Sequence, residues 1–146
     1  MAIVSKMPWR YRVHFDNFGS GELLTPLVLR VTRPDVMFYD IMGIAESEAS
    51  TVEIDLRDDV TDRARSAVIT QVAKQIKEDV EFALVIETLD ETEKVLEQWH
   101  LSACRISECR WSELAAMHQD GLLIRLTISC GRVETTANGQ MVELFG

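Results

Sequence analysis

The chain has 146 residues, of which 47% are hydrophobic and 27% charged, a composition typical of a globular domain rather than of a disordered chain. Its 15 Lys and Arg against 24 Asp and Glu give a net charge of −9, which argues against a protein that grips nucleic acid or anionic membranes through a basic face. No apolar run approaches the roughly 18 residues of a membrane-spanning helix, and the first residues do not read as a secretory signal. We expect a single domain over 1–146, made in a cytoplasm, with its core in about 8–133.

Strand patterns dominate the first 57 residues. Residues 9–15 and 51–57 alternate apolar and polar side chains, which predicts half-buried strands because successive side chains of a strand point to opposite faces. The expected elements are a strand at 9–15, a turn at 17–21, an extended stretch at 23–33 bent at Pro26, a short apolar segment at 36–41, a polar loop at 43–50 and a strand at 51–57.

The hydrophobic period then changes from two to about four. Apolar residues recur at every fourth position from Val60 to Ile76, which predicts one amphipathic helix over about 59–77. Asp58 and Asp59 suit the positive end of that helix. Val68 lies in the middle of the apolar stripe, so we expect it in the core.

Strand patterns return after the helix. The expected elements are strands at 82–88, 95–101, 105–111 and 122–128, turns at 90–93 and 118–121, and a terminal hairpin of 133–136 and 141–145 around Asn138-Gly139. About eight strands and one helix predict a mainly β sandwich or barrel, with the helix at 59–77 packed on the outside.

The core should be anchored by large side chains of the alternating strands. We expect the three tryptophans, Trp9, Trp99 and Trp111, to act as core anchors rather than as a ligand platform. The aliphatic core anchors expected with them are Leu101, Ile124, Leu126 and Ile128, together with Val68 of the helix.

Candidate chemical groups do not combine into a recognisable site. His100, Cys104, Cys109, His118 and Cys130 lack the compact spacing of zinc ligands, so we expect no metal and no cofactor. No local signature of a nucleophile surrounds any of the three cysteines, which we expect to be free core thiols. The sequence therefore predicts no catalytic residues and no enzyme.

The order of elements and several short motifs resemble the tail tube proteins of contractile-tailed bacteriophages and related contractile injection systems. The C-terminal third carries EQWHLSACRISECRWSEL and then GLLIRLTISCGRVE, similar to that family's Trp-x-Leu strand, short aliphatic strand, polar loop and aliphatic-Thr-aliphatic strand. The front half carries YRVHF, similar to the opening strand, and STVEIDLRDDVTDRARSAVITQVAKQI, similar to a strand followed by a single helix. The match covers about 8–133, and the chain departs from it in the C-terminal extension.

The resemblance implies a structural role in a virion. Members form hexameric rings whose inner strands close into one ring-wide β-barrel, and the rings stack into the inner tube of a contractile tail, the conduit for DNA ejection. The implied role is that of the major tail tube subunit, assembled in the host cytoplasm. The implied partners are other copies of the chain, the sheath protein, a baseplate or initiator ring, a tail terminator, a tape-measure protein and DNA in transit without specific binding, with no membrane.

Two further hypotheses concern particular residues of such a ring. Six copies would carry about −54, and negative charge on the bore would let DNA slide, with weak or no measurable affinity. The lumen-facing candidates are Thr51, Glu53 and Asp55, from the polar face of one strand. The second hypothesis concerns the cysteines, which are free thiols in a reducing cytoplasm. In a released, oxidised particle, the candidates for disulfides between neighbouring subunits are Cys104, Cys109 and Cys130.

Other readings stay open. A tube-initiating or baseplate ring protein shares the resemblance, as does the tube of an injection system that carries protein cargo. From a different class, a small β-barrel ligand-binding module would be a monomer or dimer with one apolar pocket. A thiol-dependent enzyme using Cys104 or Cys109 is the weakest alternative.

Overall fold

The computed structural model describes residues 3–35, 38–41, 44–47, 50–117 and 120–146. The elements in this part of the chain are β1 (Tyr11–Asp16), α1 (Gly21–Leu24), the 3₁₀ turn η1 (Thr25–Leu27), β2 (Val28–Val31), β3 (Phe38–Ile41), β4 (Ile44–Ser47), β5 (Ser50–Arg57), α2 (Arg63–Glu78), β6 (Phe82–Leu89), β7 (Val95–Trp111), β8 (Leu123–Ala137) and β9 (Gln140–Phe145). The mainly β class and the barrel are confirmed.

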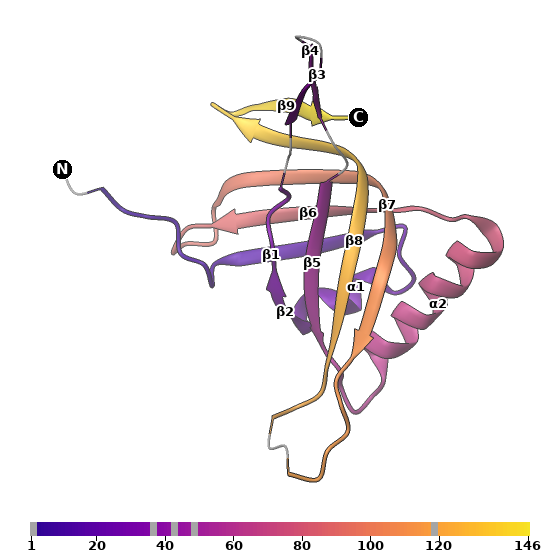
Figure 1. The fold of residues 1–146 in the computed structure, drawn as a ribbon. Coiled ribbons are helices and arrows are strands. Elements are labelled where there is room, and N and C mark those ends of the chain that lie inside the picture. The colour runs from indigo at the N-terminus through magenta and orange to yellow at the C-terminus, as the bar shows by residue number, and fades with distance from the viewer. Residues whose placement is uncertain (1–2, 36–37, 42–43, 48–49, 118–119) are drawn as a thin grey trace.

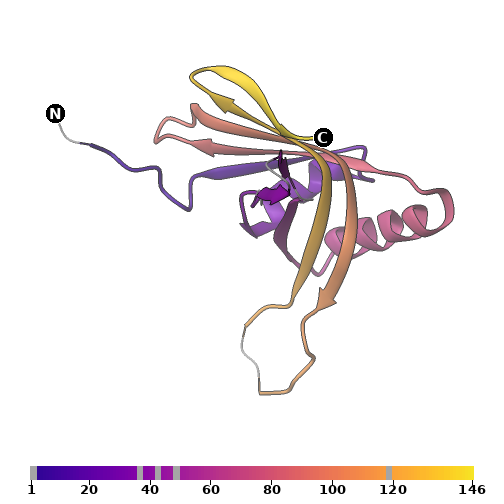
Figure 2. The same cartoon turned by 45° about the horizontal axis from the view of Figure 1, so that its top comes forward.

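Seven of these strands form one strongly curved antiparallel sheet. Its order is β1-β6-β7-β8-β5-β2, with β9 on β8, and β3 and β4 form a separate hairpin. The sheet has two halves: β1, β6 and the beginning of β7 run across the view in Figure 1, whereas the end of β7, β8, β5 and β2 run steeply down it. Figure 2 shows the same curvature with the top of the molecule turned forward. The sheet therefore curls into a nearly closed barrel.

The long strands β7 and β8 belong to both halves because they bend at one place. Ala103 of β7 has a φ of 51°, and Gly131 faces it on β8, where an added Cβ would lie 2.8 Å from the Cβ of Ala103. The strands predicted at 95–101 and 105–111 are thus one continuous strand with a bend. The strand predicted at 122–128 likewise continues into 133–136 as β8.

The core fills the space inside the curled sheet. Val68, Leu101, Ile124, Leu126 and Ile128 are buried within it, and Trp99 is half-buried and packs against it.

The other two tryptophans lie outside the core, and the prediction for them was wrong. Trp9 is 67% exposed because it sits in a turn before β1 begins, and Trp111 is 47% exposed at the far end of β7. Alternation placed both on the apolar side of a strand, but each lies at or beyond the end of its strand, where the barrel wall no longer encloses it.

Two loop predictions also change. Residues 23–27, expected to begin an extended stretch, instead belong to α1 and η1, with Pro26 in the first turn of η1, where a missing N–H costs nothing. The polar loop expected at 43–50 contains β4, which pairs with β3; residues 42–43 and 48–49 lie outside the described chain.

Helix α2 starts four residues later than predicted. The Asp59 carboxylate accepts hydrogen bonds from the N–H groups of Arg63 and Ala64, each at 3.1 Å, so it caps the helix from the preceding turn. Val60 is therefore outside the helix and fully exposed, and Ile76 points to solvent. Neither described helix is long and apolar enough to cross a bilayer.

The buried face of α2 gives the first testable prediction. Val68→Asp should destabilise the protein by roughly 3–5 kcal/mol, because it places an unpaired charge in the core. Ile76→Asp, on the exposed side of the same helix, should change the free energy of unfolding by less than about 0.5 kcal/mol. Urea unfolding of both variants measures the difference, and equal effects would refute the assigned helix face.

Candidate functional site

The most regular exposed surface is the outer face of the four neighbouring strands β2, β5, β8 and the C-terminal part of β7. Along β5, Val52, Ile54 and Leu56 are buried in the core, and the residues between them point outward. Thr51, Glu53 and Asp55, the three candidates of the sequence, therefore share this outer face. Their neighbours in register on β8 are Ser129, Thr127 and Arg125.

A row of charged residues, three arginines and one aspartate, crosses this face. Arg30, Asp55, Arg125 and Arg110 lie side by side in register on the four strands. Asp55 accepts from Arg125 Nε at 2.9 Å and from Arg30 Nε at 3.0 Å. The hydrogen bond from Arg125, and then that from Arg30, lower the pKa of Asp55, against the opposing effect of its burial.

The carboxylates of this face are matched by arginines. Arg30 also holds Glu53, with Nη2 2.6 Å from Oε2. The charged residues of the face are Arg30, Glu53, Asp55, Arg57, Arg105, Glu108, Arg110 and Arg125. Five cations against three acids do not make a repulsive acidic surface, so the charge surplus of the chain lies elsewhere. This removes the physical basis on which these acids were expected to repel DNA.

Both sides of the four-stranded region end in a strand edge. The pairing of β6 with β7 ends at Phe82 and Cys104, so among the described strands β7 from Arg105 onward pairs with β8 alone. At the other side, within the same described residues, β2 pairs with β5 alone. Such edges present unpaired backbone groups and are natural places for another strand to add.

One residue of this region was missed by sequence reasoning. The amide of Gln75 in α2 donates to the carbonyl of Ile106 at 2.8 Å and accepts from the Ile106 N–H at 2.9 Å. The sequence did contain a signal for this contact. Gln71 and Gln75, four residues apart, lie on the same side of the helix as Ala64, Ala67 and Val68, and polar residues on that buried side need hydrogen-bond partners.

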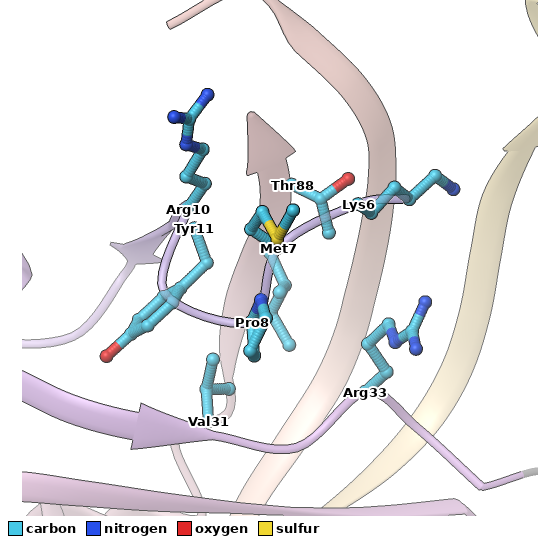
Figure 3. Close-up of a pocket in the computed structure, with 9 residues that line it drawn as sticks. Lys6, Met7, Pro8, Arg10, Tyr11, Val31, Arg33 and Thr88 are labelled. Atoms are coloured by element: carbon cyan, nitrogen blue, oxygen red, sulfur yellow. The ribbon is translucent and has the colours of Figure 1, made fainter. Parts of the chain in front are cut away.

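A pocket of about 290 Å³ lies where the N-terminal segment crosses the mouth of the barrel (Figure 3). Met7, Pro8, Tyr11, Val31 and Ile86 contribute apolar surface, while Lys6, Arg33 and Thr88 add polar groups, so the lining is mixed. Figure 3 shows the guanidinium of Arg10 directed away from the pocket. Its mixed lining differs from the mainly apolar pocket that the ligand-binding alternative predicts.

The carboxylate of Glu97 ties this mouth together. It lies 2.9 Å from Lys6 Nζ and 3.1 Å from Arg33 Nη1, so it holds both the N-terminal segment and the chain that leaves β2. Burial would raise the pKa of Glu97, but the hydrogen bonds from Lys6 and Trp99 outweigh it and lower the pKa.

The cysteines occupy two kinds of environment. Cys104 and Cys130 face each other in register at the bend and are buried, whereas Cys109 is half-buried. The hydrogen bond with Cys130 and burial raise the pKa of the Cys104 thiol, and burial raises that of Cys109. Of the three, Cys109 is the thiol that a molecule in solution can reach without opening the core.

The histidines contribute to surface contacts. His100 lies 3.3 Å from the side chain of Gln98, and His14 lies 2.8 Å from Glu87. Over the described residues, no group of three or more His, Cys, Asp and Glu is placed to hold a metal; His118 is outside them.

Comparisons with known proteins place the fold. The sequence matches no protein-family model and no curated protein. A protein of the sheath-tube complex of the extracellular contractile injection system PVC is 14% identical, with a TM-score of 0.67 over 91% of this chain and 92% of that one. A protein of the PVC sheath/tube terminator is 13% identical, with a TM-score of 0.69 over 93% and 100%. The anti-feeding prophage tube-terminating cap is 15% identical, with a TM-score of 0.68 over 94% and 95%.

These three structures share the whole architecture with this chain. At such low identity the likeness shows the fold alone, and that fold agrees with the resemblance of the sequence to the tail tube family. The family resemblance is confirmed at this level.

The charge row predicts a specific pH dependence. The folded-state pKa of Asp55 is below its unfolded value of about 3.9, so the folded state binds fewer protons and the contribution is complete above about pH 5. It is lost as the pH falls through the folded pKa. Asp55→Asn should lower the free energy of unfolding by about 1–2 kcal/mol at pH 7, a modest loss because both arginines are partly exposed and screened. It should also weaken the fall of that free energy at acidic pH.

Glu53→Gln is the matched control for this measurement. The side chain of Glu53 is half-exposed, and its one described ion pair is with Arg30, so its change should cost less than about 0.5 kcal/mol. Urea unfolding from pH 3 to 7 measures both variants. Equal losses would contradict the central role of Asp55.

Thiol accessibility gives a second prediction. In the native protein, Cys109 should react with an aromatic disulfide reagent faster than Cys104 and Cys130 by at least about tenfold, because reaction of the buried pair requires opening of the sheet. Cys109→Ser should remove the fast phase, and Cys104→Ser should leave it unchanged. A fast phase that survives Cys109→Ser would overturn the assignment.

Proposed function

We propose that this chain is a ring-forming tube subunit of a contractile machine. The observation that carries the proposal is the four-stranded face of β2, β5, β8 and β7, polar on its outer side and open at both edges. The proposal also draws on the fold, which matches a protein of a sheath-tube complex over nine-tenths of both chains.

The strand directions suit closure into a ring. All three pairings within the face are antiparallel, so its outermost strands, β2 and β7, run in opposite directions. When β7 of one copy lies beside β2 of the next, the pairing stays antiparallel at every junction. Six copies would close into one barrel, with Thr51, Glu53 and Asp55 lining the bore.

The ends of the molecule suit stacking of rings. Figure 1 shows the β3–β4 hairpin beyond the start of β5 and the connection between β7 and β8 beyond the opposite end of that strand. The exposed apolar residues near that opposite end are Leu29, Val60, Leu114, Met117 and Leu122. If a second ring stacks on the first in the direction of β5, the β3–β4 hairpin of a copy in one ring would contact the apolar end of a copy in the other. This contact would bury the exposed apolar residues.

The bore would suit passage without tight binding. Each of its three acids is paired with an arginine, so it offers no acidic surface that would strongly repel phosphates, and the acids interrupt the basic residues. We propose the major tube subunit of a phage tail, with DNA in transit and a tape-measure protein inside and a sheath outside. A baseplate ring and a terminator would border the tube, as they border the tubes of the similar injection systems.

A terminator ring is the second candidate. It is favoured by the match to a protein of the PVC terminator structure, which covers that chain completely, and to the anti-feeding prophage cap. A terminator closes a tube after one ring, whereas a tube subunit adds ring upon ring.

Electron microscopy with light scattering of the purified chain tests both candidates. We expect hollow rings with six-fold views that stack into tubes. Single rings that never stack would identify the terminator. A monomer at every concentration, which also binds a small apolar probe in one pocket, would contradict the ring proposal and favour the ligand-binding module.

A further inference from the structure

The open edge of β7 is covered at one point only among the described contacts. Between Arg105 and Trp111 this strand pairs with β8 on one side and with no strand on the other. On that free side α2 approaches, and Gln75 reaches the backbone at Ile106.

Gln75 imitates a residue of a neighbouring strand. Its amide donates to the Ile106 carbonyl and accepts from the Ile106 N–H, at 2.8 and 2.9 Å, the same exchange of two bonds that an antiparallel partner residue makes. At neutral pH a side-chain amide supplies a donor and an acceptor side by side without charge, which an ionised carboxylate cannot do. The cap therefore satisfies both edge groups of Ile106 without adding a strand.

Neighbouring contacts hold the cap in place. Arg105, directly before Ile106, forms ion pairs with Asp79 and Glu81, which follow the end of α2. One turn earlier, Gln71 donates to the carbonyl of Val80 at 3.3 Å, a bond between the helix and the connection to β6. Arg105 is therefore the residue of β7 that fixes the end of α2, and Gln71 can serve as a control.

A β-bulge lies immediately beyond the cap. The register of β7 against β8 shifts between Ile106 and Glu108, so Ser107 is the extra residue. Bulges interrupt a ladder and re-aim the strand after them. The cap and the bulge therefore divide the edge of β7 at the same place.

We propose that Gln75 sets the limit of strand addition on β7, leaving residues 107–111 as the acceptor for strand β2 of a second copy of this chain. This inference rests on the proposed ring. The free segment has five residues, and β2 has four, Val28–Val31, so the two lengths fit. Glu108 and Arg30, on the outer face of the two edges, carry opposite charges.

The cap has a clear purpose in such a ring. Without it, the free edge would extend back to Arg105, and an incoming strand could slip by two residues with its inward and outward side chains unchanged. With Ile106 occupied, a single register remains. Gln75 is a positioning residue, since it acts on the junction through the edge of β7.

Gln75→Leu, with Gln71→Leu as the matched control, tests the proposal. Both changes place a leucine on the same side of α2, and only the first uncovers a strand edge. We expect hydrogen exchange at the Ile106 amide to rise about tenfold or more in Gln75→Leu and to stay unchanged in Gln71→Leu. Sedimentation and electron microscopy should show irregular or aggregated assemblies for Gln75→Leu alone.

Gln75→Glu provides the test should the leucine variant not fold. At pH 7 one oxygen of its carboxylate can still accept from the Ile106 N–H, but the other oxygen has no proton and repels the Ile106 carbonyl. This repulsion opens the cap, so hydrogen exchange at the Ile106 amide should be raised. Protonation restores a donor, so exchange at Ile106 relative to the wild type should fall again near pH 4. Loss of the cap by general destabilisation would not be reversed by acid.

The outcomes separate this inference from the ring itself. If the wild type forms rings and Gln75→Leu forms the same rings at the same rate, the cap proposal is overturned and the ring stands. If Ile106 keeps its protection in both Gln75 variants, the cap is equally refuted. If the wild type stays monomeric while Gln75→Leu alone aggregates, the cap limits strand addition and the ring proposal fails.

Discussion

The architecture depends on the close approach of Ala103 and Gly131 at the bend of the long β7–β8 pair. Only a residue without a Cβ fits opposite Ala103, whose own backbone lies in the left-handed region. This contact lets two strands serve both halves of the sheet, so the barrel can curl around a single core. It also lifts the C-terminal part of β7 away from β6, because their pairing stops at Cys104. The bend that closes the core is therefore the same feature that opens an edge.

An open edge is useful to a protein only if its reach is controlled, because an unlimited edge accepts any extended chain. The described chain controls its edges with side chains rather than with further strands. Tyr11 donates its hydroxyl to the carbonyl of Val28, covering the part of β2 closest to β1. Gln75 covers Ile106 on β7 in a similar way. Each cap blocks one point, and the remaining backbone stays available for pairing.

Much of the fold was predictable from local patterns. Alternation located β1 and β5, a run of apolar and β-branched residues located β6, and the change of period located α2, since burial leaves a direct trace in the sequence. The Asn138-Gly139 pair forms the expected turn, with both residues at positive φ. Residues 21–27 were missed because a single helical turn carries too few positions for a period. The bend at Ala103 was read as a break for a related reason: alternation fails there although hydrogen bonding continues.

The candidate site was only partly predictable, because its properties arise between strands. Thr51, Glu53 and Asp55 were correctly placed on one face of a strand by alternation. Their charge was misjudged because Arg30 and Arg125 are distant in the sequence and meet Asp55 only through the register of three strands. The role of Gln75 could not be predicted either, because its partner Ile106 is also distant in the sequence. A glutamine on the inward side of a helix signals a buried backbone partner, but the sequence does not say which strand supplies it.

The distribution of charge follows from these pairings. A buried carboxylate without a partner would be destabilising, and Asp55 has an arginine on either side. The negative surplus of the chain therefore lies on other surfaces. This arrangement joins β2, β5 and β8 by side chains as well as by the backbone ladder. It therefore stiffens the face across its width while its outermost backbone remains open. A surface with fixed internal register and free edges is suited to joining with copies of itself, since each copy then presents its neighbours with the same geometry.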